Sequence, residues 1–196
     1  MSLWTQTDCL VTTSMAIRAE GFETACRRSA LQGWPVQVRK SGGGTVFHCP
    51  DVLCATFLFD GGQDGFSIDW AYRHFTAIIL NALGSLGVPA TVGDAPRAPC
   101  DGRFNILVDG RKLAGTAMRT RNSAERTCVL GHASIQIGPR ISEGLLAVEA
   151  FERDIGLDVS YPASASICLE ELLGPRPVPR FAQALRDCVS DQAALA

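Results

Sequence analysis

Arg39-Lys40-Ser41-Gly42-Gly43-Gly44-Thr45-Val46-Phe47-His48 is the stretch that carries most of the chemistry in this sequence. Three successive glycines lack Cβ atoms, so the backbone can approach a ligand closely and expose consecutive N–H groups. Such N–H concavities bind anions, and the Arg39 guanidinium adds a planar, charged donor for phosphate or carboxylate. The spacing matches neither the Walker loop nor the dinucleotide-binding fingerprint. On composition alone, a glycine turn between two strands explains the stretch equally well.

A β-hairpin is expected further along the chain. Asp109-Gly110-Arg111 separates two alternating segments, Phe104–Val108 and Lys112–Met118, and Asp-Gly is a strong hairpin signal. The two-residue period of a strand predicts that Lys112 shares one face with Ala114, Thr116 and Met118. An ammonium group beside such small residues can reach across a groove toward a developing negative charge. A solvated lysine next to a turn is the alternative.

A third segment is Gly131-His132-Ala133-Ser134, which lies in the apolar stretch Cys128–Ile137. This stretch has the composition of a strand. Taken alone, His132 is expected to be a hydrogen-bonded structural histidine rather than a catalytic one.

Together the three segments resemble the lipoate–protein ligase family, whose superfamily also holds biotin–protein ligases and octanoyltransferases. The family motif of Arg, Ser, three Gly, Val, an aromatic residue and His is similar to residues 39–48. Its Gly-Arg/Lys-Lys motif is similar to G-R-K-L-A-G-T-A at 110–117, and its late His-Gly-Ser/Thr strand is similar to His132–Ser134. The resemblance runs in the correct order from about Leu3 to Leu173.

This resemblance implies an α+β fold with a mixed, largely antiparallel sheet flanked by helices, of the biotin/lipoate-ligase type with a class II synthetase-like core. It also implies a catalytic domain over residues 1–174. Residues 175–196 would then be a linker and a short helix, with no separate accessory domain.

The implied activity is activation of lipoate or octanoate with ATP to an acyl adenylate, followed by transfer of the acyl group to a lysine of a lipoyl carrier domain. Lys112 is the implied catalytic residue, because its ammonium would contact the acyl carbonyl and the phosphate. The implied nucleotide- and acyl-binding residues are Arg39, Ser41, Gly42, Gly43, Gly44, Thr45, Val46, Phe47, His48, Asn105, Gly115, Thr116, Ala117 and His132. Mg²⁺ would accompany the ATP, although Asn105 stands where the family commonly has an aspartate.

Two other functions are consistent with the sequence. Some relatives transfer the acyl group through a cysteine thioester without ATP, and Cys100, flanked by Arg97 and Arg103, is the candidate nucleophile. An ordinary loop thiol is the alternative for this residue. A non-catalytic homologue that retains the ligand site is the other function.

Composition excludes several further classes. The 196 residues suit one domain, and a formal net charge of −2 offers no basic footprint for nucleic acid. No apolar run is long enough to span a bilayer. The chain does not open on a leader-like segment, so we expect a cytoplasmic protein whose eight cysteines are reduced thiols and form no metal site.

The pattern of apolar residues predicts the following elements. Strands are expected at Phe104–Val108, Lys112–Met118 and Cys128–Ile137, as described above. The other expected strands are Cys9–Thr13, Pro35–Arg39, Val46–His48 and Val52–Asp60. The expected helices are Gly21–Leu31, Ile68–Leu86 with Asp69 as its cap, Ser142–Ile155 with Ser142 as its cap, Ser164–Leu173 and Arg180–Val189. Thr91–Gly102 is expected to be a loop.

Overall fold

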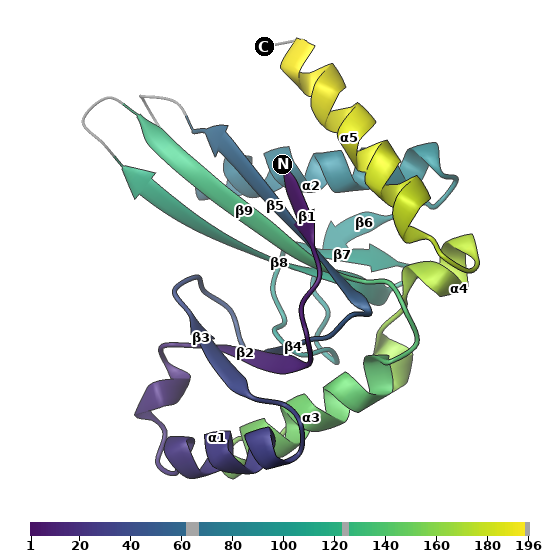
Figure 1. Ribbon diagram of the computed structural model, residues 1–196. Helices are drawn as coiled ribbons and strands as arrows, with labels where there is room; N and C mark the ends of the chain where they lie inside the picture. Colours follow the sequence, from purple (N-terminus) through teal and green to yellow (C-terminus); the bar gives the residue numbers. More distant parts are fainter. Residues whose placement is uncertain (62–66, 123–125, 195–196) are drawn as a thin grey trace.

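The computed structural model describes residues 1–61, 67–122 and 126–194. Its largest element is a six-stranded sheet in which every pair of neighbours is antiparallel (Figure 1). The strands, in their order across the sheet, are β1 (Ser2–Trp4), β5 (Val52–Asp60), β9 (Thr127–Gln136), β8 (Arg111–Asn122), β7 (Asn105–Val108) and β6 (Thr91–Gly93). The long central strands alternate between two faces, so one face is available for a core and the other for a site.

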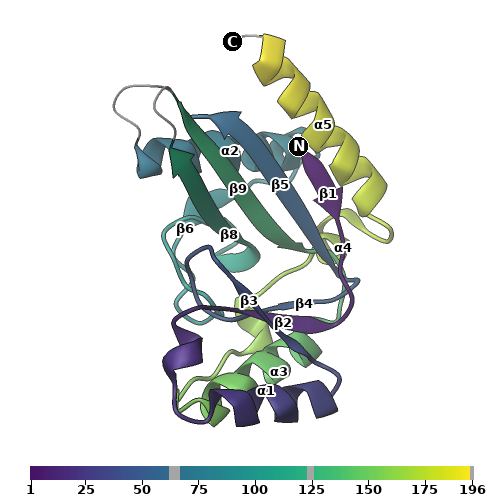
Figure 2. The ribbon, with the colours of Figure 1, turned by 60° about the vertical axis from the view of Figure 1, so that its left-hand side comes forward.

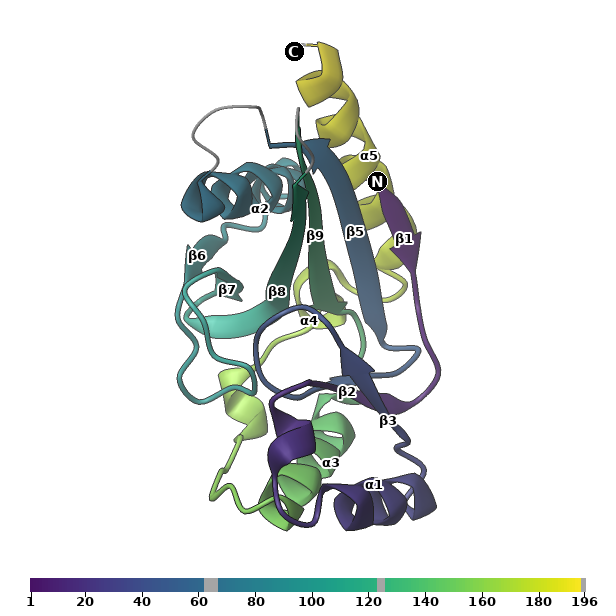
Figure 3. The ribbon, with the colours of Figure 1, turned by 90° about the vertical axis from the view of Figure 1, so that its left-hand side faces the viewer.

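A second, smaller sheet lies at one end of the large one (Figure 3). It consists of β3 (Val36–Arg39), β2 (Cys9–Thr13) and β4 (Val46–His48), with β2 parallel to β3 and antiparallel to β4. The expected α+β class with a mixed, largely antiparallel sheet is therefore confirmed, and the strands are divided between two sheets.

Two helical layers enclose these sheets (Figures 1 and 2). Helices α2 (Ile68–Ser85) and α5 (Val178–Ala194) cover one face of the large sheet, and Phe75, Phe181 and Leu185 are fully buried in that core. Helices α1 (Phe22–Leu31) and α3 (Ile141–Asp154) pack against the small sheet, where Phe151 is buried. The remaining elements are the short turns η1 (Ala16–Arg18) and η2 (Ala163–Ala165) and the helix α4 (Leu169–Leu173).

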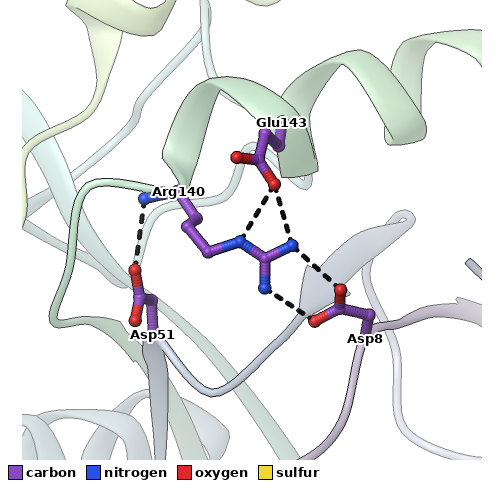
Figure 4. A network of polar contacts seen from close by, with 4 residues as sticks. All are labelled: Asp8, Asp51, Arg140 and Glu143. Carbon is purple, nitrogen blue, oxygen red and sulfur yellow. Dashed lines mark hydrogen bonds and ion pairs between the residues drawn. The ribbon is translucent and has the colours of Figure 1, made fainter. Parts of the chain in front are cut away.

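Arg140 connects the small sheet to the start of α3 (Figure 4). Its guanidinium donates two 2.9 Å hydrogen bonds to the Asp8 carboxylate and one of 2.9 Å to Glu143. Its backbone N–H donates to Asp51 Oδ2 at 3.3 Å. A bidentate pair of this kind fixes orientation as well as distance. The network therefore ties β2, the β4–β5 turn and α3 together beneath the large sheet.

Three expected helix caps or starts differ from the structure. Ser67, not Asp69, caps α2, because its Oγ accepts the Trp70 N–H, while Asp69 pairs with Arg103. Helix α3 begins at Ile141, one residue before Ser142, so Ser142 is not its cap. Helix α5 begins before Arg180, at Val178. Pro179 is the second residue of α5, and proline is tolerated in the first turn of a helix because its missing N–H needs no partner there.

The expected helix Ser164–Leu173 is wrong over its first half. Ser166 forms a parallel bridge to Lys112, and the Ile167 N–H donates to the Lys112 carbonyl at 3.0 Å. This pairing holds the segment extended, so helix begins only at Leu169. The prediction also missed β1, and it missed β6 inside the expected loop Thr91–Gly102.

The C-terminal division of the chain at residue 174 stays a prediction. None of the helices in the described ranges has the length and apolar composition needed to cross a bilayer.

Candidate functional site

A β-bulge decides where the Lys112 side chain lies. Leu107 pairs with Lys112, but Ile106 pairs with Ala114, so Leu113 is an extra residue in β8. The bulge shifts the alternation, and Lys112 therefore lies over Gly115, whose Cβ position is 3.4 Å from Lys112 Nζ. Ala114 points into the core on the opposite face. The expected common face of Lys112 and Ala114 is wrong for this reason.

The ammonium of Lys112 is buried and hydrogen-bonded to a loop. The residue is 4% exposed, which excludes the alternative of a solvated lysine. Its Nζ donates to the carbonyl oxygen of Pro99 at 2.6 Å and to that of Cys100 at 3.1 Å. Burial lowers the pKa of Lys112 from 10.5 to about 8. At neutral pH the group is thus a charged donor in a poorly solvated place.

Arg39 folds back over the three glycines. Its Nη2 donates to the carbonyls of Gly42 at 3.0 Å and Gly44 at 2.6 Å, and its Nη1 donates to Val11 at 2.8 Å. Burial lowers the pKa of Arg39, although a guanidinium remains charged. The side chain therefore braces the glycine loop against β2 and places a positive charge beside it.

Cys100 lies directly on the glycine loop. The Gly44 N–H donates to Cys100 Sγ at 3.0 Å, and Arg39 Nη2 is 3.9 Å from the same sulfur. Gly43 has a φ of +102°, and a Cβ there would come within 2.5 Å of Cys100 Sγ. Only glycine suits such a position. The loop residue and the three-glycine turn thus form one unit, joined to β8 by Lys112.

Between the two sheets lies a cavity of about 210 Å³. Its walls come from β8, β9 and β5 of the large sheet and from β2 and β4 of the small one. The structure brings these expected residues to its wall: Arg39, Val46, Phe47, His48, Cys100, Lys112, Gly115, Thr116, Ala117 and His132. Sequence reasoning missed several others, among them Trp4, Val11, Val52, Cys54, Ser134 and Gln136.

A second cavity, of about 250 Å³, adjoins the first at Cys100 and Thr116, which line both. Gly42, Gly43 and Asn105 lie in its wall. The Asn105 carboxamide donates to the Gly102 carbonyl at 2.8 Å, which fixes the loop before β7.

Three residues of the expected set line neither of these cavities. Ser41 and Thr45 are buried, and Thr45 shares a 3.0 Å hydrogen bond with Thr12. Gly44 acts through its N–H to Cys100. These residues therefore stabilise the glycine loop through their burial and hydrogen bonds, and they do not line the space that a ligand would fill.

The two histidines of the cavity are neutral at pH 7. Burial lowers the pKa of His48 to about 4, and burial also lowers that of His132. His48 stacks on Trp4 at a ring separation of 6.3 Å and contacts Cys54 Sγ through Nδ1 at 3.2 Å. Burial raises the pKa of Cys54 to about 12, so that thiol stays protonated. The cavity is therefore uncharged away from Arg39 and Lys112.

The described residues do not fit a metal ion held by the protein. Over 1–61, 67–122 and 126–194, no group of three His, Cys, Asp or Glu side chains is placed to share an ion. Asn105 presents a carboxamide where a carboxylate ligand for Mg²⁺ was considered. We therefore assign no step to a protein-bound Mg²⁺.

The fold is that of lipoate ligases. A crystal structure of lipoate-protein ligase A bound with ATP superimposes with a TM-score of 0.76 at 17% identity, covering 98% of this chain and 71% of that one. A putative lipoate protein ligase from T. acidophilum with bound lipoic acid gives a TM-score of 0.73 at 16% identity, covering 98% of this chain and 71% of that one.

Sequence comparison gives the family. Residues 2–186 match the lipoyl protein ligase A/B catalytic domain, and the chain belongs to this family of ligases and acyltransferases. An uncharacterized protein of Cupriavidus necator is 32% identical over 184 residues, which is 87% of this chain and 73% of that protein. The octanoyl-[GcvH]:protein N-octanoyltransferase of Kyrpidia tusciae is 29% identical over 141 residues, which is 69% of this chain and about half (49%) of that enzyme. The expected family and its enzymatic character are confirmed.

Proposed function

We propose that this protein transfers a medium-chain acyl group, lipoyl or octanoyl, to a lysine of a lipoyl carrier domain. The observation that carries the proposal is the position of Lys112. Its ammonium is buried at the wall of a largely uncharged cavity. Among the described residues that line this cavity, Lys112 and Arg39 carry the positive charges. An acyl chain would occupy the uncharged part of the cavity, and its carbonyl would meet the ammonium.

A preorganised charge stabilises a transition state most strongly where water is excluded. As the carrier lysine attacks the acyl carbonyl, negative charge grows on its oxygen, and a fixed ammonium stabilises that charge more than it stabilises the reactant. In this scheme Lys112 stabilises the charge and the two reactants are held together by the cavity and the carrier.

For activation of the acyl group, we propose the ATP-dependent route first. The second cavity supports it, because Gly42, Gly43 and Asn105 line a space that meets the acyl cavity at Cys100 and Thr116. In this route the acyl carboxylate attacks the α-phosphorus of ATP and pyrophosphate leaves. The carrier lysine then attacks the carbonyl carbon and AMP leaves.

The experiment incubates the protein with lipoate or octanoate, ATP and Mg²⁺, with and without a lipoyl carrier domain. Mass spectrometry then looks for the acyl adenylate and for the acylated carrier. If neither product forms, and if an octanoyl thioester donor also gives no acylated carrier, the proposed function is wrong.

A specific observation favours a second route, through Cys100. Its sulfur accepts the Gly44 N–H at 3.0 Å and lies 3.9 Å from Arg39 Nη2, so it lies at the glycine loop and at the wall of the acyl cavity. The Cys100 sulfur would attack the carbonyl of an acyl thioester, forming a new S–C bond while the donor sulfur leaves and takes the proton that Cys100 loses. The carrier lysine would then attack the Cys100 thioester, so that the amide bond forms as the S–C bond breaks, and the proton that the lysine loses would go to the released Cys100 sulfur.

The two routes differ in their dependence on Cys100. Incubation with an octanoyl thioester followed by mass mapping locates any acylated cysteine. Under the thioester route, Cys100→Ser abolishes both the adduct and the transfer, whereas Cys128→Ser, at an exposed thiol, changes neither. Under the ATP route, Cys100→Ser retains adenylate formation. An adduct on another cysteine removes Cys100 from consideration as nucleophile.

A further inference from the structure

One row of residues crosses the wall of the acyl cavity at right angles to the strands. Its members lie opposite one another in the neighbouring strands β8, β9, β5 and β1, and all of them line the cavity. In that order they are Gly115, Ser134, Cys54 and Trp4. The row begins at the charged end of the cavity, because Lys112 Nζ lies 3.4 Å from the Cβ position of Gly115. It ends on β1, at the edge of the large sheet (Figure 3).

The side chains of this row change abruptly in size at Trp4. The other three members carry short side chains or none, so they form a shallow floor. The Trp4 ring spans the gap between the sheets, because it stacks on His48 of β4 with the ring centroids 6.3 Å apart and the planes within 8°. Its indole N–H also donates to Thr56 Oγ1 at 3.3 Å, which fixes the ring. An extended chain that starts at Lys112 and follows the floor therefore meets a flat ring at its far end.

The spacing of the strands gives the length of this floor. Neighbouring strands lie about 4.8 Å apart, so the three intervals from β8 to β1 span about 14 Å. A van der Waals contact with the ring takes up about 4 Å of this and leaves roughly 10 Å. An extended acyl chain gains about 1.25 Å per carbon–carbon bond, so an octanoyl chain spans about 9 Å and a dodecanoyl chain about 14 Å. The shorter chain fits between Lys112 and the ring, and the longer one does not.

Resting on the proposed function, we propose that Trp4 is a specificity-determining residue that sets the upper limit of the acyl chain length. A chain as long as octanoyl fills the floor up to the ring, and each further methylene must displace the ring. Lipoyl and octanoyl groups have chains of the same length, so the limit accepts both. It discriminates against longer acyl groups, which a straight apolar channel with an open end would bind more tightly.

Calorimetric titration of the full chain with hexanoic, octanoic, decanoic and dodecanoic acids tests this limit. For the wild-type protein, affinity should rise from hexanoic to octanoic acid and fall by about tenfold or more from octanoic to dodecanoic acid. In Trp4→Ala, affinity should continue to rise beyond octanoic acid, by up to about fourfold for each methylene that becomes buried. The order of octanoic and dodecanoic acids should therefore reverse between the two proteins.

Trp70→Ala is the matched control. Trp70 is 46% exposed, against 44% for Trp4, and it also stacks on a histidine, His74, at a ring separation of 5.0 Å. It lies on α2, which covers the opposite face of the large sheet. This variant should keep the wild-type order of affinities.

Cys54→Leu should move the limit in the other direction. Cys54 lies next to Trp4 in the row, so a larger side chain there fills the floor just before the ring. The preference should then shift from octanoic acid toward hexanoic acid.

The outcomes separate the two proposals. If dodecanoic acid binds the wild-type protein as tightly as octanoic acid, the inference about Trp4 is wrong while acyl binding stands. If Trp4→Ala keeps the wild-type order, or weakens all the acids by the same factor, Trp4 only packs and the inference is again wrong. If no acid binds the wild-type protein, both proposals fail. Circular dichroism checks the fold of each variant. If Trp4→Ala does not fold, the shift in Cys54→Leu decides the question, and if neither folds, the wild-type order decides it.

Discussion

Lys112 Nζ donates a 2.6 Å hydrogen bond to the carbonyl oxygen of Pro99, and this bond attaches the start of β8 to the loop that carries Cys100. Since Cys100 in turn accepts the Gly44 N–H, the glycine loop, the loop of Cys100 and the start of β8 form one hydrogen-bonded unit. The same ammonium has a structural role and a proposed catalytic one. Substitutions of Lys112 therefore need a readout for each role.

Replacing Lys112 by methionine should lower the transfer rate by at least about a hundredfold, because the carbonyl oxygen loses its buried cation. The same change leaves the Pro99 and Cys100 carbonyls without their donor, so the free energy of unfolding should fall by about 1–3 kcal/mol. Single-turnover transfer assays and urea unfolding measure the two effects. Lys40→Met, at an exposed lysine of the glycine motif, should change neither. Full activity in Lys112→Met would contradict the proposed role.

Transfer should also depend on the charge of Lys112. Because burial lowers its pKa to about 8, the wild-type rate at saturating substrate, divided by that of Lys112→Arg, should be level below that pH and fall above it. The guanidinium of Lys112→Arg stays charged, and the ratio cancels the titration of the carrier lysine, which must lose a proton before it attacks. A ratio that stays level to pH 10 would show that the ammonium is not required.

The same pKa has the opposite effect on stability. Between pH 8 and 10.5 the unfolded chain retains a proton on Lys112 that the folded chain has released. The free energy of unfolding of the wild type, relative to Lys112→Met, should therefore rise with pH in this window, by at most about 1.4 kcal/mol per pH unit. Urea unfolding of both proteins at several pH values measures this difference in free energy. The contributions of cysteines and tyrosines that titrate in the same range are common to both proteins and cancel in the subtraction.

Arg39→Lys tests the brace over the glycine loop. One ammonium cannot reach the carbonyls of Val11, Gly42 and Gly44 together, as the guanidinium does. We expect the free energy of unfolding to fall by about 1–3 kcal/mol and the KM for the acyl substrate to rise by roughly tenfold. Arg27→Lys, on the exposed side of α1, is the control. An unchanged unfolding midpoint together with a normal KM would mean that the loop holds its shape without Arg39.

Local signals explain which parts of the fold were predictable from the sequence. Asp109 and Gly110 have φ angles of 50° and 72°, as a two-residue hairpin turn requires, and that requirement is visible in the residue types. The bulge at Leu113 depends instead on how β8 pairs with β7, which no local pattern encodes. The extended pairing of Ser166 with Lys112 is likewise long-range, so a helical pattern there was misleading.

The candidate site shows the same division. The glycines and Lys112 were identifiable because their chemistry is unusual for their positions. Trp4 and Gln136 were not, although strand alternation places each on a definite face. Alternation says which residues share a face, but only the docking of the small sheet decides that this face, and not the one under α2, encloses a cavity.

The contact between Gly144 of α3 and the ring of Phe47 on β4 gives a prediction that links packing to the cavity. A Cβ at residue 144 would overlap the Phe47 ring. This ring is buried in the core between the small sheet and helices α1 and α3, and it also lines the acyl cavity. Gly144→Ala should therefore lower the free energy of unfolding by about 1–3 kcal/mol and weaken acyl binding, because the ring must move.

Gly84→Ala is the matched control for this substitution. Gly84 lies within α2, and beyond its chain neighbours and the adjoining helix backbone no described atom lies within 4 Å of its Cβ position, so alanine should stabilise the helix by up to about 1 kcal/mol. Phe47→Leu should recover part of the stability lost in Gly144→Ala, since the smaller side chain leaves room for the methyl group. Urea unfolding of the two single variants and the double variant gives the coupling between the residues. Effects that simply add would show that Gly144 and Phe47 do not limit each other, and that α3 does not shape the cavity through this ring.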